Sequence, residues 1–110
     1  MTATVDADQL VRAVDRLVTQ VGHWSPARWA SATPLGDCSR ADLVHTLAQR
    51  LADLEAEATG RSRRPVPRLD NDLALPDQLR VLALDLVVVD VGAQVRAAAL
   101  DAVNATRQRL

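Results

Sequence analysis

The sequence predicts an all-α protein, an antiparallel bundle of three to four helices. Two segments, 6–21 and 39–60, carry apolar residues at the spacing of one helix face. A third apolar segment starts at Pro76 and continues past residue 95 without a turn signal, which is too long for a strand. At 110 residues the chain is expected to form a single domain, 1–110.

The first helix is expected over Asp6–Val21. Asp6 or Asp8 can cap its start, and Gly22 ends it. Its apolar residues fall on one face: Leu10, Val14, Leu17, Val18 and Val21.

A short helical turn is expected over Pro26–Ala30. Ser25 is a good N-cap residue and Pro26 a good first helical residue. Trp24 and Trp29 then occupy the two positions of a hydrophobic staple. We interpret the two tryptophans as an anchor for this loop, and stacking on a ligand is the alternative.

The second long helix is expected from Ser39 to Gly60. Ser39 and Asp42 resemble a capping box in which Asp replaces Glu. At 100° per residue, His45 lies on roughly the opposite side from the apolar stripe, so we expect a surface histidine facing water. The stripe consists of Leu43, Val44, Leu47, Leu51, Leu54 and Ala58.

A basic linker at about 60–75 separates the second and third long helices. Its four arginines are a candidate site for a phosphate or an acidic partner, and the other interpretation is a solvated connector whose charges partly cancel. These arginines are Arg61, Arg63, Arg64 and Arg68. Aromatic residues are missing from this linker, which disfavours nucleic-acid binding.

The third helix should be centred on Leu79–Val95, which is apolar nearly all round. Gly92 would mark a kink or a close helix contact. Asp85 and Asp90 stand on different sides of this helix, so we expect one to face outward and the other to be buried and paired with Arg, with metal or general-base work as the alternative. Residues 98–110 either extend this helix or fray, and the sequence leaves open whether they supply a fourth helix.

A helix that is apolar on most sides must be covered on most sides. Two other long helices and one short turn give limited cover, so we expect a homodimer or a helical protein partner. The expected interface residues are Leu84, Val87, Val88, Val91 and Val95.

Composition favours a cytoplasmic protein. The net charge is −1, so no overall field attracts nucleic acid. Cys38 is the only cysteine, which suits a reducing compartment. The N-terminus shows no signal-peptide pattern. Asp85 and Asp90 would each cost about 2.5–3.5 kcal/mol at a bilayer centre, which argues against a membrane span in the third helix.

The candidates for metal binding are few. The two histidines and the single cysteine match no known zinc spacing. If a metal is bound, the candidate ligands are His45, Asp85 and His23. We assign no catalytic residue and expect no cofactor.

The order of these segments resembles a known family. The loop WSPARWASATPLGDCS is followed by a helix opening SRADLVHTLA, a basic linker, and a helix with LALDLVVVDVG. This order is similar to the DinB-like superfamily, specifically to the N-terminal domain of mycothiol-dependent maleylpyruvate isomerase-like proteins. The resemblance implies a four-helix bundle. It also implies a divalent metal held by the histidine of a D-L-V-A-H motif and by the Glu and His of an E-L-V-V-H motif.

Carried over residue by residue, this metal site is degenerate. Thr46 stands at the position of the first histidine, with His45 one residue early. Asp85 stands at the position of the Glu, and Val89 at that of the second histidine. Leu35 and Cys38 replace the Cys and Trp of the first motif. One carboxylate cannot hold a catalytic zinc, which typically needs three protein ligands.

The resemblance therefore suggests a non-catalytic binding or interaction module, although the question of enzymatic activity stays open. One alternative is a transferase or isomerase that depends on zinc or another divalent metal together with mycothiol. Another is a phosphate or nucleic-acid binder that uses the arginine-rich linker.

Overall fold

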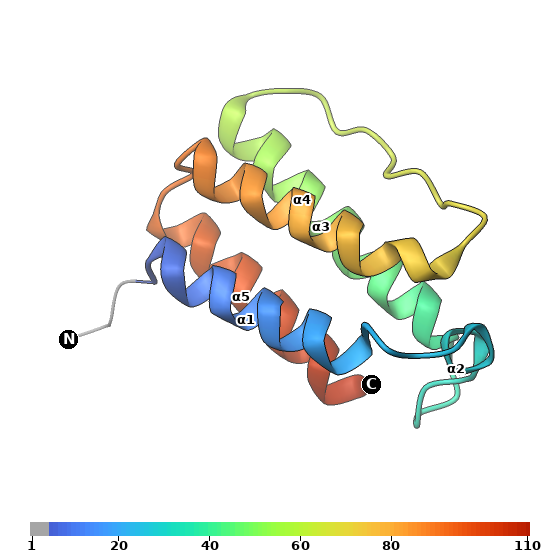
Figure 1. Ribbon diagram of the computed structural model, residues 1–110. Helices are drawn as coiled ribbons and strands as arrows, with labels where there is room; N and C mark the ends of the chain where they lie inside the picture. The colour runs from blue at the N-terminus through green and yellow to red at the C-terminus, as the bar shows by residue number, and fades with distance from the viewer. Residues whose placement is uncertain (1–4) are drawn as a thin grey trace.

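The structure, a computed structural model, describes residues 5–110 and shows an all-α bundle over this range (Figure 1). Its elements are α1 (Ala7–Val21), α2 (Pro26–Ala30), α3 (Arg40–Thr59), the 3-10 turn η1 (Asp72–Ala74), α4 (Leu75–Val88) and α5 (Ala93–Arg109). The predicted fold class is confirmed. The expectation of no signal segment rests partly on residues 1–4, which lie outside the described residues.

The helix ends form where capping chemistry predicts them. Asp6 and Gln9 make a reciprocal capping box at the start of α1. The Ser39 hydroxyl accepts a hydrogen bond from the Asp42 backbone N–H, 3.0 Å away, at the start of α3. Gly60 ends α3 with a φ of 72°, a left-handed conformation that glycine adopts without steric cost.

The two tryptophans anchor α2 as expected. Ser25 caps the helix, and the rings of Trp24 and Trp29 meet edge to face with their centroids 5.1 Å apart. Trp29 is fully buried in the core, and the Arg28 guanidinium lies 5.2 Å from the centre of the Trp24 ring. With Trp29 enclosed, the pair forms a structural staple and leaves no open stacking surface between the rings.

The single long helix predicted from Pro76 onward is wrong. α4 ends at Val88 and α5 starts at Ala93. Between them Asp90 has a φ of 55° and Gly92 a φ of 88°, and neither value is compatible with a continuing right-handed helix. Gly92 therefore permits a chain reversal, not a kink. Residues 98–110 belong to α5, so this chain supplies its own fourth long helix.

The four long helices do not simply alternate in direction. Arg68 pairs with Asp42, near the start of α3, and with Asp72, just before α4, so α3 and α4 begin at the same end of the bundle. Arg40 donates to the carbonyl oxygen of Leu110, so α5 ends where α3 begins. The bundle is thus antiparallel for α1 with α4 and for α3 with α5, while α3 and α4 run parallel (Figure 1).

A long crossover makes the parallel pair possible. α3 contains 20 residues, which corresponds to a length of about 30 Å. The segment that we name the crossover segment (residues 60–71) leads from its end to η1 in an extended conformation. A dozen extended residues reach up to about 40 Å, enough to return along the whole of α3. Figure 1 shows this segment beside the upper helices.

The core lies between α1, α3, α4 and α5, with α2 closing one end. Every predicted stripe residue of α1 is buried, and so is every one of α3 except Ala58, which lies exposed near the end of that helix. Val66 of the crossover segment packs on the core from outside. The largest fully buried side chains are Trp29, Leu10, Leu17, Leu51, Leu75, Leu79 and Leu86.

Candidate functional site

The three candidate metal ligands are not brought together. His23 is exposed and follows α1, at the end of the bundle closed by α2. Asp85 is exposed and lies near the end of α4, toward the opposite end (Figure 1). Over residues 5–110, no three His, Cys, Asp or Glu side chains are placed to share a metal ion.

The family motif positions do not offer a set of metal ligands either. Thr46 lies near the start of α3, and Asp85 and Val89 lie at the end of α4. Thr46 also donates its hydroxyl hydrogen to the Asp42 carbonyl oxygen, 2.9 Å away within its own helix. Of the three motif positions, only Asp85 carries a side chain that commonly binds metal ions.

The expectation of a buried carboxylate in the third helix is wrong. Asp85 is exposed on α4, and Asp90 lies in the turn after it with its side chain 83% exposed. Asp90 pairs with Arg96 at 3.0 Å, but the pair is on the surface. The error has a direct cause, because the helix ends before Asp90 and the helical wheel no longer applies there.

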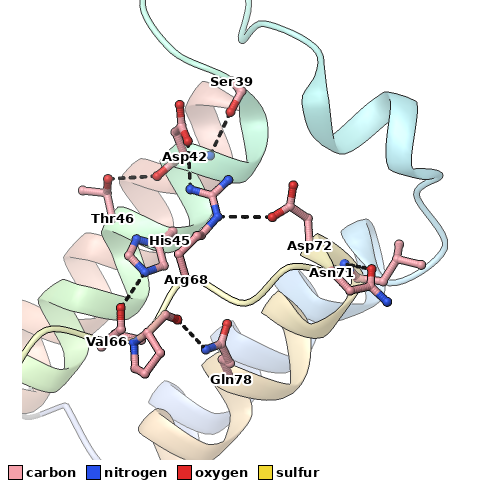
Figure 2. A network of polar contacts seen from close by, with 11 residues as sticks. Ser39, Asp42, His45, Thr46, Val66, Arg68, Asn71, Asp72 and Gln78 are labelled. Atoms are coloured by element: carbon pink, nitrogen blue, oxygen red, sulfur yellow. Dashed lines mark hydrogen bonds and ion pairs between the residues drawn. The ribbon is translucent and has the colours of Figure 1, made fainter.

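His45 does not face open water, contrary to prediction. Its ring is half-buried beneath the crossover segment, and its Nε2–H donates to the carbonyl oxygen of Val66, 2.9 Å away (Figure 2). Gln49, one helical turn later, accepts from the Val66 N–H at 2.7 Å and donates to the Arg64 carbonyl oxygen at 3.0 Å. Side chains on the polar face of α3 therefore bind the backbone of the extended crossover segment.

The Arg68 side chain closes this network near the start of α3. It donates to the carboxylates of Asp42 at 2.9 Å and Asp72 at 3.2 Å (Figure 2). The hydrogen bond from Arg68 is the main cause that lowers the pKa of the Asp42 carboxyl group, and the Ser39 cap acts in the same direction. The same contact raises the pKa of Arg68.

Most arginines of the cluster considered as a candidate anion site are paired with carboxylates. Arg61 pairs with Glu55 and Arg63 with Glu57, both on the last turns of α3. Arg68 has two acidic partners. Only Arg64 among the four predicted arginines has no ion pair within residues 5–110. The cluster thus resembles the solvated connector, because three of its four arginines have a carboxylate partner on α3.

A row of exposed apolar side chains on α4 is a clearer candidate for a binding site than the arginine cluster. Val81, Leu84 and Val88 of α4 are 60%, 58% and 74% exposed, and their spacing of three and four residues places them in one row. We name this row the α4 ridge. The opposite face of α4 is buried in the core through Leu79, Ala83 and Leu86.

The five predicted interface residues divide accordingly. Leu84 and Val88 belong to the α4 ridge, and Val87 is half-buried beside it. Val91 and Val95 pack against the core of their own chain, from the turn and from α5. The α4 ridge also contains Val81, which was not among the predicted residues although its helical spacing from Leu84 and Val88 could have found it.

Two grooves flank the α4 ridge. One, of about 450 Å³, lies toward the crossover segment and is lined by apolar residues including Val66, Pro67, Leu69 and Val81. The other, of about 210 Å³, lies toward α1 and is lined by residues including Val11, Val14 and Leu84. A second helix can pack against such a surface by placing its own row of side chains in a groove beside the ridge.

Comparison with known proteins gives no further information about the site. No protein-family model, curated protein or solved structure matches this chain. Within the described residues, no helix is both long and apolar enough to cross a membrane. The candidate functional site is therefore defined by its own geometry, as the α4 ridge with its two grooves.

Proposed function

We propose that this chain is a small, non-catalytic interaction module that binds a helical protein partner through the α4 ridge. The observation that carries the proposal is the row formed by Val81, Leu84 and Val88, three large aliphatic side chains more than half exposed on one helix face. A contiguous exposed apolar row is typical of a protein contact, whereas scattered apolar residues are not.

The site chemistry supports binding over catalysis. His45 is engaged with a backbone carbonyl, and the motif positions Thr46 and Val89 offer no strong metal donors. If the resemblance to mycothiol-dependent maleylpyruvate isomerase-like proteins reflects kinship, this chain is a relative that has the helical bundle but lacks the metal site. We propose that it works in the cytoplasm, since its single cysteine suits a reducing compartment.

The experiment compares wild-type protein with Leu84→Arg, which places a charge in the middle of the α4 ridge. Association should be measured both as self-association, by sedimentation, and as retention of identified partner proteins from the source cells. We expect Leu84→Arg to weaken the association at least about tenfold, with little change in stability because Leu84 is largely exposed.

Leu35→Arg is the matched control. Leu35 is 73% exposed but lies in the loop before α3, away from the α4 ridge. Its substitution should leave association unchanged. Equal behaviour of wild type and Leu84→Arg in both assays would overturn the proposed function.

A further inference from the structure

We propose that the partner of the α4 ridge is a second copy of this chain, whose own α4 packs alongside in parallel about a two-fold axis. The inference rests on the proposed function and deepens it by naming the partner and its orientation. Three features of α4 carry it: the spacing of its exposed apolar residues, their type, and the charges on either side of them.

The α4 ridge has the spacing of a coiled-coil seam. Val81, Leu84 and Val88 follow one another at intervals of three and four residues, as positions a, d and a of a heptad. β-Branched residues at a with leucine at d favour a parallel pair of helices over higher assemblies. The ridge has this composition over the eight residues from Val81 to Val88.

The charged residues beside the ridge favour a parallel orientation of the two α4 helices. With Val81 at position a, Arg80 occupies position g and Asp85 position e. In a parallel pair, g of one helix lies beside the following e of the other, so Arg80 of each copy meets Asp85 of the other. An antiparallel pair would instead place g positions beside g positions and e positions beside e positions, so Arg80 of one copy would not meet Asp85 of the other.

Both charged side chains are available for this contact. Arg80 and Asp85 are exposed, and in the described part of the chain neither has an ion-pair or hydrogen-bond partner for its side chain. The two-fold axis doubles each contact, which gives two Arg80–Asp85 pairs at the edges of the apolar seam. The charge pattern is thus self-complementary in the parallel arrangement alone.

The size of the seam sets the strength of the dimer. Toward its N-terminal end the next d position is Asp77, which is exposed, and two copies of this carboxylate would repel each other and end the contact. A seam of three residues per copy buries less than the roughly 800 Å² per partner of a standard interface. We therefore expect a reversible dimer with a dissociation constant on the order of micromolar.

Charge exchange between copies tests the orientation. Arg80→Asp and Asp85→Arg should each weaken the dimer about tenfold, because each turns both ion pairs into like-charge contacts. An equimolar mixture of these two variants should form a heterodimer of nearly wild-type affinity, because every pair is then attractive again. The double variant Arg80→Asp/Asp85→Arg should also recover. Native mass spectrometry separates the species, and circular dichroism confirms that each variant folds.

The outcomes separate this inference from the proposed function. A wild-type monomer at 100-fold above the expected micromolar range would overturn the dimer, and so would a dimer whose affinity the single variants leave unchanged. Recovery in neither the mixture nor the double variant would reject the parallel orientation. If a monomeric wild type still retains an identified partner through Leu84, the proposed function stands without the dimer. If association never depends on Leu84, both fail.

Discussion

The ion pairs of Arg68 show how single side chains give the crossover segment its path. The Arg68 side chain contacts both Asp42 on α3 and Asp72 on the approach to α4. Its partners are partly exposed, so each contact alone contributes little to stability. Their combined role is to fix where the crossover segment ends.

Replacing Arg68 by Gln should return the pKa of the Asp42 carboxyl group toward its ordinary value. In the folded protein this pKa is lowered, mainly by the hydrogen bond from Arg68. A lowered folded-state pKa means that the stabilisation is present above the unfolded-state pKa and is lost as the pH falls through the folded-state value. The wild type should therefore lose this contribution in acid, while Arg68→Gln lacks it at every pH.

Carboxyl NMR titration of both proteins measures this difference. Arg63→Gln is the control, because Arg63 pairs with Glu57 and not with Asp42. An Asp42 titration curve that is the same in wild type and Arg68→Gln would contradict the assignment of Arg68 as the main cause.

Local chemistry predicted the helix starts well because capping depends on neighbours in sequence. Asp6, Ser25 and Ser39 each cap the helix that follows them, as their spacing to the next backbone N–H groups indicates. The position of His45 was not predictable in this way. Its burial depends on Val66, which is 21 residues away and carries no helical or strand pattern. Helical periodicity predicts which face of a helix is apolar, but it does not predict which other segment of the chain covers the polar face.

The turn between α4 and α5 could not be predicted from helical periodicity either. Apolar residues continue through Val91 and Val95, so composition alone favours one helix. The chain reverses because Asp90 and Gly92 adopt positive φ values, and because α5 can then pack on α1 and α3. The reversal exchanges the hydrogen bonds of an uninterrupted helix for the packing of α5 against α1 and α3.

Gly92→Ala should destabilise the protein by about 1–3 kcal/mol. With a φ of 88° and a ψ of 162°, Gly92 lies in a backbone region that is almost restricted to glycine. An added Cβ would meet no atom within 4 Å, so backbone strain and not a clash causes the loss. Urea unfolding measures the free energy.

Asp90→Asn controls for the charge in the same turn. It removes the surface ion pair with Arg96 but keeps a residue type that tolerates a positive φ. Its effect should stay within about 1 kcal/mol. If the two substitutions cost the same, backbone strain at Gly92 does not control this turn.

The arrangement of the bundle depends on contacts that join distant parts of the chain. The predicted all-α bundle is confirmed, but the parallel direction of α3 and α4 follows from the length and anchoring of the crossover segment. No residue pattern within either helix encodes that direction.

Arg40 links several of these distant parts through one side chain. It is buried at the start of α3 and donates to the Ser31 hydroxyl oxygen at 2.8 Å, to the Ala32 carbonyl oxygen, and to the Leu110 carbonyl oxygen at 3.3 Å. One guanidinium group therefore connects the loop after α2, the start of α3 and the end of α5. A buried cation is stable only when its N–H groups are satisfied, which the carbonyl oxygens provide here.

Arg40→Lys should destabilise the protein by about 1.5–3 kcal/mol, since an ammonium group keeps the charge but cannot reach all three oxygen atoms with the fixed fork of a guanidinium. Arg50→Lys, at an exposed position of α3, is the control and should have little effect. Urea unfolding gives the free energies, and hydrogen exchange at the end of α5 should increase in Arg40→Lys alone. A loss of stability without faster exchange there would mean that Arg40 acts only within its own loop, and that α5 is held by the apolar core.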